Sequence, residues 1–260
     1  MPKLFATGSD PEYFIVSGAG QPVAPKAAHI PGNKRAPVAL TCGGKIHRDN
    51  ACLELNIVPA RTGEELVANM REARQEAEIM YLAPMNNMLS DWQFMYIPDQ
   101  WKKYKEIMIL GCDPSLDCWD YESPMQYDPF DPFRSAGGHV HISYENPSML
   151  MSQRIACILD IKLGLRYSTL MERDNPRRHG YGRSGQMRFT PYGLEYRPLS
   201  NKWTFSDDAI VDVHNTCVNV VENVEAYWST LLAEYSVPEV KRIFYDGSEA
   251  EVTACLSKFS

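Results

Sequence analysis

The sequence predicts an α+β fold in which helices cover one face of an antiparallel sheet. Two observations support this fold class. Strand-like and helix-like segments are interspersed along the chain, and the strand-like segments alternate polar with apolar residues. No linker-like stretch divides the 260 residues, so we expect residues 1–260 to form a single domain.

The expected strands are short and separated by polar or glycine-containing turns. Residues 17–38, rich in Gly, Pro and Ala, are interpreted as a loop or hairpin region. The 106–111 segment is expected to be a buried strand. Together with it, the predicted strands are 11–16, 53–58, 139–144 and 194–198.

The helices are predicted from their start signals. Thr62 and Glu65 fit a capping box, which predicts a helix running to about residue 81. An amphipathic helix is expected at 147–165, with Pro147 near its first turn. Ser206 is a candidate cap for a long helix to about residue 235, and a short helix is expected from about residue 248.

Composition and charge exclude several classes of protein. Hydrophobic residues make up 44% and charged residues 23%, which is typical of a globular chain. The net charge of −7 argues against a surface built to grip nucleic acid, so no nucleic-acid partner is expected. No apolar run has the length of a membrane span and no signal peptide is recognised, so a soluble, cytoplasmic protein is expected.

The number of cysteines, seven, is odd and there is no CxxC pair, so a disulfide framework is not expected in a cytoplasmic chain of this size. Cys157 and Cys217 lie in apolar helical patterns and are interpreted as core thiols.

Chemically active side chains share one face in each of four strand segments, because side chains in a strand alternate between faces. The four pairs are Asp10 with Glu12, Glu54 with Asn56, His139 with His141, and Glu195 with Arg197. Any one pair taken alone is more typical of a solvated sheet face. Together, the carboxylates and imidazoles favour a site for Mg²⁺ or Mn²⁺, since clustered carboxylates repel one another unless a cation holds them.

A second constellation lies in residues 177–188, which hold four arginines and three glycines. Glycines let backbone approach a ligand closely, and arginine forks match phosphate oxygens. The segment therefore favours a phosphate site over the alternatives of a solvated basic loop or a nucleic-acid patch. The sequence has neither a Walker A motif nor a GxGxxG turn, so a P-loop or Rossmann site is not indicated.

The 112–138 segment has no sustained period and is rich in prolines, acids and aromatic residues. Irregular runs of this length inside a domain are more often functional than idle, so we interpret this one as a candidate lid over the site.

The motifs, taken in order, resemble those of a known family. They are Gly-Ser-Asp-Pro-Glu at 8–12, Asp-Asn-Ala-Cys-Leu-Glu-Leu-Asn at 49–56 with Pro59, Gly-Cys-Asp-Pro at 111–114, Ala-Gly-Gly-His-Val-His-Ile at 136–142, Arg-Arg at 177–178, Tyr-Gly at 181–182, and Tyr-Gly-Leu-Glu-Tyr-Arg-Pro-Leu-Ser-Asn-Lys-Trp at 192–203. The chain resembles, nearly end to end, the phage carboxylate–amine ligases of the phiEco32-like type 2 group. These belong to the superfamily of glutamine synthetase and glutamate–cysteine ligase.

The resemblance implies a glutamine synthetase-like catalytic domain, in which a curved antiparallel sheet presents a concave polar active-site face and helices pack on the other face. It implies ATP and Mg²⁺, or Mn²⁺, as cofactors. The metal ligands that it implies are Asp10, Glu12, Glu54, His139 and Glu195. The contacts to ATP phosphates that it implies are Arg177, Arg178, Arg183, Arg188 and Arg197. Glu54, His141 and Arg197 are the residues it assigns to catalysis, with His141 on the substrate side. Asp10 stands where better-known relatives have a glutamate, one methylene longer.

The implied activity is ATP-dependent amide formation between small-molecule or peptide carboxylate and amine substrates, through an acyl phosphate. A phosphotransferase of the guanidino-kinase type on the same fold is an alternative, as is a binding protein on a degenerate ligase fold. The substrates and the oligomeric state, including a homo-oligomer, are left open by the sequence.

Overall fold

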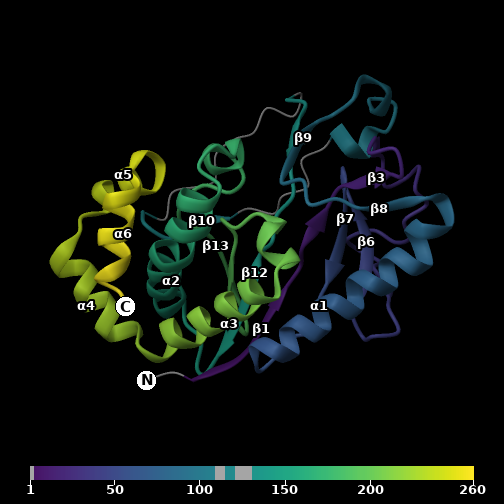
Figure 1. Cartoon of the computed structure of the whole chain (residues 1–260). Helices are drawn as coiled ribbons and strands as arrows, with labels where there is room; N and C mark the ends of the chain where they lie inside the picture. Colours follow the sequence, from purple (N-terminus) through teal and green to yellow (C-terminus); the bar gives the residue numbers. More distant parts are fainter. Residues whose placement is uncertain (1–2, 109–114, 121–130) are drawn as a thin grey trace.

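The polar strand faces lie on two neighbouring antiparallel sheets in the computed structural model of the chain (Figure 1). The structure describes residues 3–108, 115–120 and 131–260. Over these residues it is a mixed α/β fold with several antiparallel sheets and six α-helices. This agrees with the predicted α+β class, whereas the glutamine synthetase-like architecture stays a prediction.

The largest sheet is assembled from distant parts of the chain. Its order is β1 (Leu4–Ser9), β12 (Val140–Tyr144), β14 (Gly193–Tyr196), β13 (Gln186–Thr190) and β10 (Leu116–Asp117), all antiparallel. Val140, Ile142 and Leu194 are fully buried in the main hydrophobic core. Because side chains alternate, His141 and Glu195 emerge on the opposite face.

A second sheet of four strands continues the first. Its order is β2 (Glu12–Tyr13), β7 (Cys52–Asn56), β6 (Lys45–Asp49) and β5 (Val38–Ala39). Two smaller sheets complete the strands: β4 (Pro22–Val23), β3 (Ile15–Ser17) and β8 (Asn87–Leu89) in one, and β11 (Phe133–Ser135) with β9 (Phe94–Tyr96) in the other.

Backbone hydrogen bonds connect the two larger sheets along the N-terminal segment. The Ile57 amide donates to the Ser9 carbonyl at 2.9 Å, and the Leu55 amide donates to the Pro11 carbonyl at 3.1 Å. Thr7 and Ala60 exchange a pair of bonds at 2.9 and 2.7 Å. The N-terminal segment therefore pairs with β12 on one side and with residues after β7 on the other.

The α-helices pack partly on the apolar face of the strands and partly on one another. They are α1 (Gly63–Ala77), α2 (Met149–Leu159), α3 (Asp207–Glu222), α4 (Val224–Glu234), α5 (Val237–Asp246) and α6 (Glu249–Ser257). Figure 1 shows α1, α2 and α3 on one side of the strands, where α2 packs on β13 and β14, and α3 on β1. Among the described residues, no helix is both long and apolar enough to cross a bilayer.

Two α-helices continue as π-helical segments. They are η1 (Glu78–Leu82) after α1 and η5 (Asp160–Met171) after α2. Short 3-10 turns fill several connections: η2 (Ala83–Met85), η3 (Asp99–Trp101), η4 (Lys105–Met108), η6 (Pro176–His179) and η7 (Asn201–Phe205).

The predicted helix starts are confirmed at Thr62 and Ser206. The Thr62 hydroxyl accepts from the Glu65 amide at 3.1 Å, but the Glu65 carboxylate accepts from the Arg61 amide, so the capping box is half formed. The Ser206 hydroxyl accepts from the Ala209 amide at 3.4 Å. The single long helix predicted to follow is interrupted at Asn223, which separates α3 from α4.

The helix expected at 147–165 begins at Met149, because the Ser148 hydroxyl accepts from the Met151 amide at 3.2 Å. It runs on through η5 to Met171. The short C-terminal helix is present as α6, with Ser248 in a complete capping box, and α5 was not predicted. Cys157 and Cys217 are buried in the core as predicted.

The strand predicted at 106–111 is wrong for its first three residues, which lie in η4. The Ile107 amide donates to the Tyr104 carbonyl at 3.0 Å, and Arg134 donates to the Ile107 carbonyl. A local turn and a side chain thus supply the hydrogen bonds that a neighbouring strand would have made. Residues 109–111 lie outside the described part of the chain.

Three other segments differ in detail from the prediction. The 11–16 strand is divided between β2 and β3, which join different sheets, and β1 before it was not predicted. The arginine- and glycine-rich segment 177–188 ends in strand β13. The candidate lid at 112–138 lies partly outside the described residues, and its described parts form β10 and β11, so its role stays a prediction.

Candidate active site

Two histidines and two acids meet where β1 ends beside β12 and β14. Asp10 follows β1, His139 precedes β12, and His141 pairs in register with Glu195 of β14. The His139 Nδ1 atom lies 3.3 Å from Asp10 Oδ1 and 3.4 Å from Glu195 Oε1. The His141 Nε2 atom lies 3.2 Å from the same Asp10 oxygen. We call these four residues the histidine cluster.

The charges within the histidine cluster largely compensate one another. Burial alone would raise the pKa of Asp10, but His141 and His139 outweigh it and hold that pKa well below its usual range. Burial lowers the pKa of His139 to about 4, helped by the charge of Arg197. His141 has its pKa raised, since Asp10 and Glu195 outweigh the effect of burial.

Two arginines neutralise Glu195, whose side chain is only 1% exposed. The Arg188 Nη1 atom lies 3.1 Å from Glu195 Oε2. Arg197 donates through Nη1 to Glu195 Oε1 and through Nη2 to the Tyr181 hydroxyl. Glu195 therefore orients both guanidinium groups from beneath the site, while the Arg188 side chain is 30% exposed on the site face.

A second group of acids lies on the neighbouring sheet. Glu12 of β2 pairs in register with Glu54 of β7, and Asp49 is the last residue of β6. These three residues offer carboxylate oxygens within 4.8 Å of one another. The Gly137 amide donates to Glu12 Oε2 at 2.6 Å, and the Asn56 amide nitrogen donates to Glu54 Oε1 at 3.2 Å. We call Glu12, Asp49 and Glu54 the carboxylate cluster.

The carboxylate cluster carries poorly compensated negative charge. Burial, followed by repulsion from Asp49, raises the pKa of Glu12 to about 7. Burial together with the charges of Asp10, Asp49 and Glu12 raises the pKa of Glu54 well above its usual value. Near it, burial lowers the pKa of His47 to about 4, and the His47 Nε2 atom lies 3.6 Å from Glu54 Oε1.

A hard divalent cation fits the carboxylate cluster, because oxygen ligands that repel one another are what Mg²⁺ and Mn²⁺ bind. Asp10, His141 and Glu195 also offer ligand atoms within 4.8 Å of one another. There, however, both acids already have imidazole or guanidinium partners. The shared face predicted for Asp10 and Glu12 is thus divided between two adjoining clusters, one on either side of Pro11.

The other predicted arginines are arranged differently from Arg188 and Arg197. Arg177 is buried behind the site, where it donates to the carbonyls of Arg197 at 3.1 Å and Leu199 at 3.0 Å. Arg178 donates to the carbonyls of Arg173, Phe244 and Tyr245, which fastens it to α5. Arg183 lies near Tyr245, where its charge opposes the rise that burial causes in the pKa of that phenol.

Sequence reasoning missed four residues of the site: His47, Asp49, Tyr181 and Tyr192. Tyr192 donates to or accepts from His141 Nδ1 at 2.6 Å, and the ring of Tyr181 packs edge-on against His139. Asp49, Tyr181 and Tyr192 stood inside the quoted motifs without an assigned role. His47 shares a strand face with Asp49, a pattern that would have identified both if β6 had been predicted.

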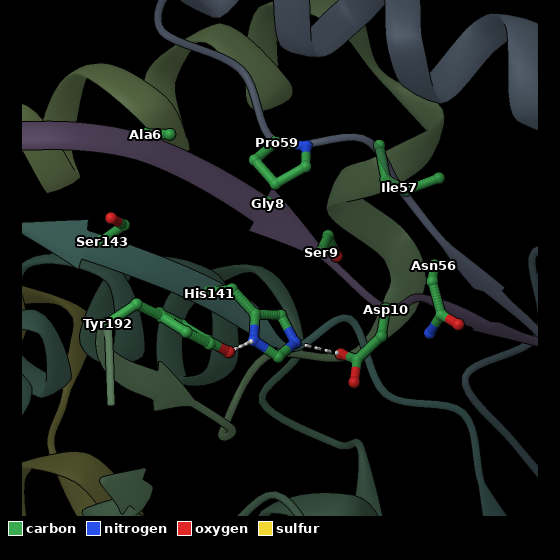
Figure 2. A pocket seen from close by; sticks show the side chains of 10 residues that line it. All are labelled: Ala6, Gly8, Ser9, Asp10, Asn56, Ile57, Pro59, His141, Ser143 and Tyr192. Carbon is green, nitrogen blue, oxygen red and sulfur yellow. Dashed lines mark hydrogen bonds and ion pairs between the residues drawn. The ribbon is translucent and has the colours of Figure 1, made fainter. Parts of the chain in front are cut away.

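A cavity of about 420 Å³ opens beside the histidine cluster. Figure 2 shows Asp10 and His141 together at one part of its lining, with Tyr192 beside His141 and with Pro59 and Ile57 on the opposite side of β1. The complete lining is Ala6, Gly8, Ser9, Asp10, Asn56, Ile57, Pro59, His141, Ser143 and Tyr192.

Comparison with known proteins gives one match. Residues 126–260 match the model of the family described as Phage phiEco32-like COOH.NH2 ligase-type 2. The match covers β11 onward, including β12, β13 and β14 and the site residues in or next to them: His139, His141, Arg188, Glu195 and Arg197. No curated protein and no solved structure shows a significant match.

Proposed function

This chain belongs to the phage phiEco32-like COOH.NH2 ligase-type 2 family, and we propose that it joins a carboxylate to an amine through an ATP-derived acyl phosphate. The observation that carries the proposal is the side-by-side placement of two unlike clusters. One is a group of three carboxylates, of which Glu12 and Glu54 are buried and have raised pKa values, and the other is a histidine cluster flanked by paired arginines. Such a pairing suits a reaction that must hold a polyphosphate and bring two small substrates together.

A carboxylate needs activation because its own leaving group would be oxide. Transfer of the γ-phosphoryl group of ATP to the carboxylate oxygen gives an acyl phosphate and ADP. Attack of the amine nitrogen on the carbonyl carbon then breaks the bond from carbon to the phosphate oxygen and gives the amide and orthophosphate. In such reactions catalysis consists largely of positioning and of neutralising charge on the phosphates.

Arg188 and Arg197 are the residues that we assign to the phosphates. Glu195 holds both guanidinium groups in place, and the Tyr181 hydroxyl holds the far nitrogen of Arg197. Preorganised arginine donors cost little reorganisation when charge develops on a transferring phosphoryl group. Arg177 supports Arg197 from behind through its carbonyl, whereas Arg178 is engaged with α5 and has no part in the proposed reaction.

The carboxylate cluster would hold Mg²⁺ or Mn²⁺ through Glu12, Asp49 and Glu54. Asp10 and Glu195 of the histidine cluster would lie near the ion but would not be its main ligands. When bound, the ion would supply positive charge to the β- and γ-phosphates. His141, held between Asp10 and Tyr192 at the edge of the cavity, is the group that we assign to receive the proton of the attacking amine.

The test follows the carboxylate oxygen. A screen for metal-dependent phosphate release with pools of amines and carboxylates identifies a substrate pair. The carboxylate is then labelled with oxygen-18. We expect one labelled oxygen in orthophosphate and ADP as the nucleotide product. Label in AMP would overturn the acyl phosphate route. A stable phosphorylated product with no free phosphate would favour the phosphotransferase alternative.

A further inference from the structure

The floor of the 420 Å³ cavity is formed by unusually small side chains. In β1, Ala6 and Gly8 point to the same face because they are two residues apart, and Asp10 follows the end of the strand. Their partners in β12 are Ser143, opposite Ala6, and His141, opposite Gly8. The sheet face is therefore nearly bare of side chains until it reaches the histidine cluster, which leaves the space that the cavity occupies.

The two walls of the cavity are largely apolar, whereas the side of the site with Arg188 and Arg197 is cationic. Ile57 and Pro59 supply apolar surface on one side, and the Tyr192 ring stands on the other (Figure 2). Asn56 and Ser143 add uncharged polar groups. Among the described residues that line it, the cavity has no lysine or arginine, and its one imidazole, that of His141, is already engaged with Asp10 and Tyr192.

The anionic side chain in the cavity lining is Asp10, which is paired there with His141. Its side chain is 20% exposed while its Oδ1 atom lies against His141. A cavity with apolar walls and a carboxylate at one end is complementary to a positively charged head group on an apolar body. Arg188, which suits anions, reaches Glu195 from β13, on the side away from β12, and Arg197 lies beside His139 with its guanidinium held by Glu195 and Tyr181.

We propose that this cavity receives the amine substrate as a primary ammonium ion with a compact, uncharged aliphatic body, its head at Asp10 and its body over Gly8 between Pro59 and Tyr192. The assignment rests on the proposed ligase function and adds to it the class of the amine. It places the carboxylate substrate and ATP on the arginine side of the histidine cluster. Free amino acids are disfavoured, because no lysine or arginine among the described lining residues would pair with their own carboxylate.

Gly8 gives the means to test the assignment without disturbing the clusters. A Cβ atom added at Gly8 would lie 3.6 Å from Pro59 Cγ and 3.8 Å from His141 Cβ, which are ordinary van der Waals contacts. Gly8→Ala should therefore fold normally and place one methyl group where the aliphatic body lies. Ala39→Val, on the exposed side of β5, is the matched control for an added aliphatic group.

The experiment measures binding rather than turnover. The full chain with Mg²⁺ is titrated with ethyl-, propyl- and butylammonium, with butyrate and with butanol, and dissociation constants are taken from ligand-observed NMR. In the wild type we expect affinity to rise about fourfold per methylene, and butyrate to bind at least tenfold more weakly than butylammonium. Gly8→Ala should lower butylammonium affinity at least fourfold and flatten the series, while Ala39→Val leaves it unchanged.

Asp10→Asn should remove the advantage of butylammonium over butanol, with a thermal unfolding midpoint confirming that the variant is folded. Tighter binding of butyrate than of butylammonium would overturn the proposal, as would a series that Gly8→Ala does not alter. Neither result depends on phosphoryl transfer. If no oxygen-18 enters orthophosphate but the alkylammonium affinities are as expected, the ligase chemistry is rejected and the amine site stands. If oxygen-18 enters orthophosphate but the alkylammonium affinities are not as expected, the amine site is rejected and the ligase chemistry stands.

Discussion

Glu12 and Glu195 are both buried acids, yet their surroundings give them opposite properties. Glu195 has a guanidinium on each carboxylate oxygen. Glu12 has the Gly137 amide, two further acids nearby and a pKa raised to about 7. A side chain kept at such a cost in stability commonly belongs to a functional site, because burial and like charges destabilise the ionised form.

Glu12→Gln should stabilise the metal-free protein and abolish its response to metal. A pKa raised in the folded state means that ionisation opposes folding as pH rises through about 7, so the gain should be largest above that pH. Glutamine keeps the oxygen that accepts from Gly137. We expect a gain on the order of 1–3 kcal/mol at pH 8 in chelator.

Thermal unfolding with EDTA or with millimolar Mn²⁺ measures both effects. The wild type should gain stability with Mn²⁺ and the variant should not, because only binding to the native state raises the midpoint. Glu72→Gln, at an exposed position of α1, is the control. An unchanged Mn²⁺ response in Glu12→Gln would remove the carboxylate cluster from the proposal.

Arg197→Lys should weaken Mg·ATP binding at least tenfold although the charge is kept. Lysine cannot contact Glu195 and Tyr181 at once, as the guanidinium fork does, so its position is lost. Isothermal titration of Mg·ATP measures the change, with Arg35→Lys in an exposed loop as control. Equal affinities for the variant and the wild type would show that Arg197 does not hold the nucleotide.

Strands β12, β13 and β14 place most of the site, and a glycine sets their register. Gly193 has φ +148°, and a Cβ atom there would lie 2.1 Å from the Ile142 carbonyl oxygen. The backbone of β14 therefore approaches β12 more closely than any side chain allows. This approach brings Glu195 opposite His141 and Arg188.

Gly193→Ala should destabilise the protein by more than about 2 kcal/mol, through both the left-handed φ and the clash with backbone. Gly20→Ala separates the two causes. Gly20 also has a positive φ, +71°, but nothing lies within 4 Å of its Cβ position, so we expect a cost of about 1 kcal/mol. Urea unfolding measures both, and equal costs would contradict the role given to the close approach.

Sequence reasoning found the strands whose pattern lies within a few neighbouring residues and missed the features that depend on pairing between distant strands. The strands with His141 and Glu195 alternate cleanly, and alternation is a local property. β1, Leu-Phe-Ala-Thr-Gly-Ser, does not alternate clearly between polar and apolar residues, and β13 follows an arginine- and glycine-rich loop whose composition hid its alternation. The carboxylate cluster depends on β6 pairing with β7 and β2 with β7. Such pairing is a tertiary property, so Asp49 could not be placed beside Glu12 from the sequence alone.

At the scale of the whole molecule, the site is made by two halves of the chain. The family match covers residues 126–260, which supply His139, His141, Arg188, Glu195 and Arg197. The N-terminal half supplies Asp10, Glu12, Asp49 and Glu54, and it also supplies β1, the edge strand paired with β12. Neither half contains both clusters.

A fragment of residues 131–260 should therefore fail to fold cooperatively and should not bind Mn²⁺. Removing β1 leaves the β12 edge without its partner and exposes the apolar face that α3 covers. Circular dichroism during urea titration, with Mn²⁺ binding followed by electron paramagnetic resonance, compares the fragment with the full chain. A sharp unfolding transition and retained Mn²⁺ binding would show that the C-terminal half is self-sufficient.

Pro11 connects the histidine cluster to the carboxylate cluster. It separates Asp10 from Glu12, and its carbonyl accepts from the Leu55 amide of β7. The pyrrolidine ring fixes φ, so the two carboxylates leave the backbone in directions that cannot vary independently. The proline ring thus restricts the separation between the proposed metal site and the proposed amine site. A substitution at Pro11 would remove neither carboxylate, yet it would change the positions of Asp10 and Glu12 relative to each other.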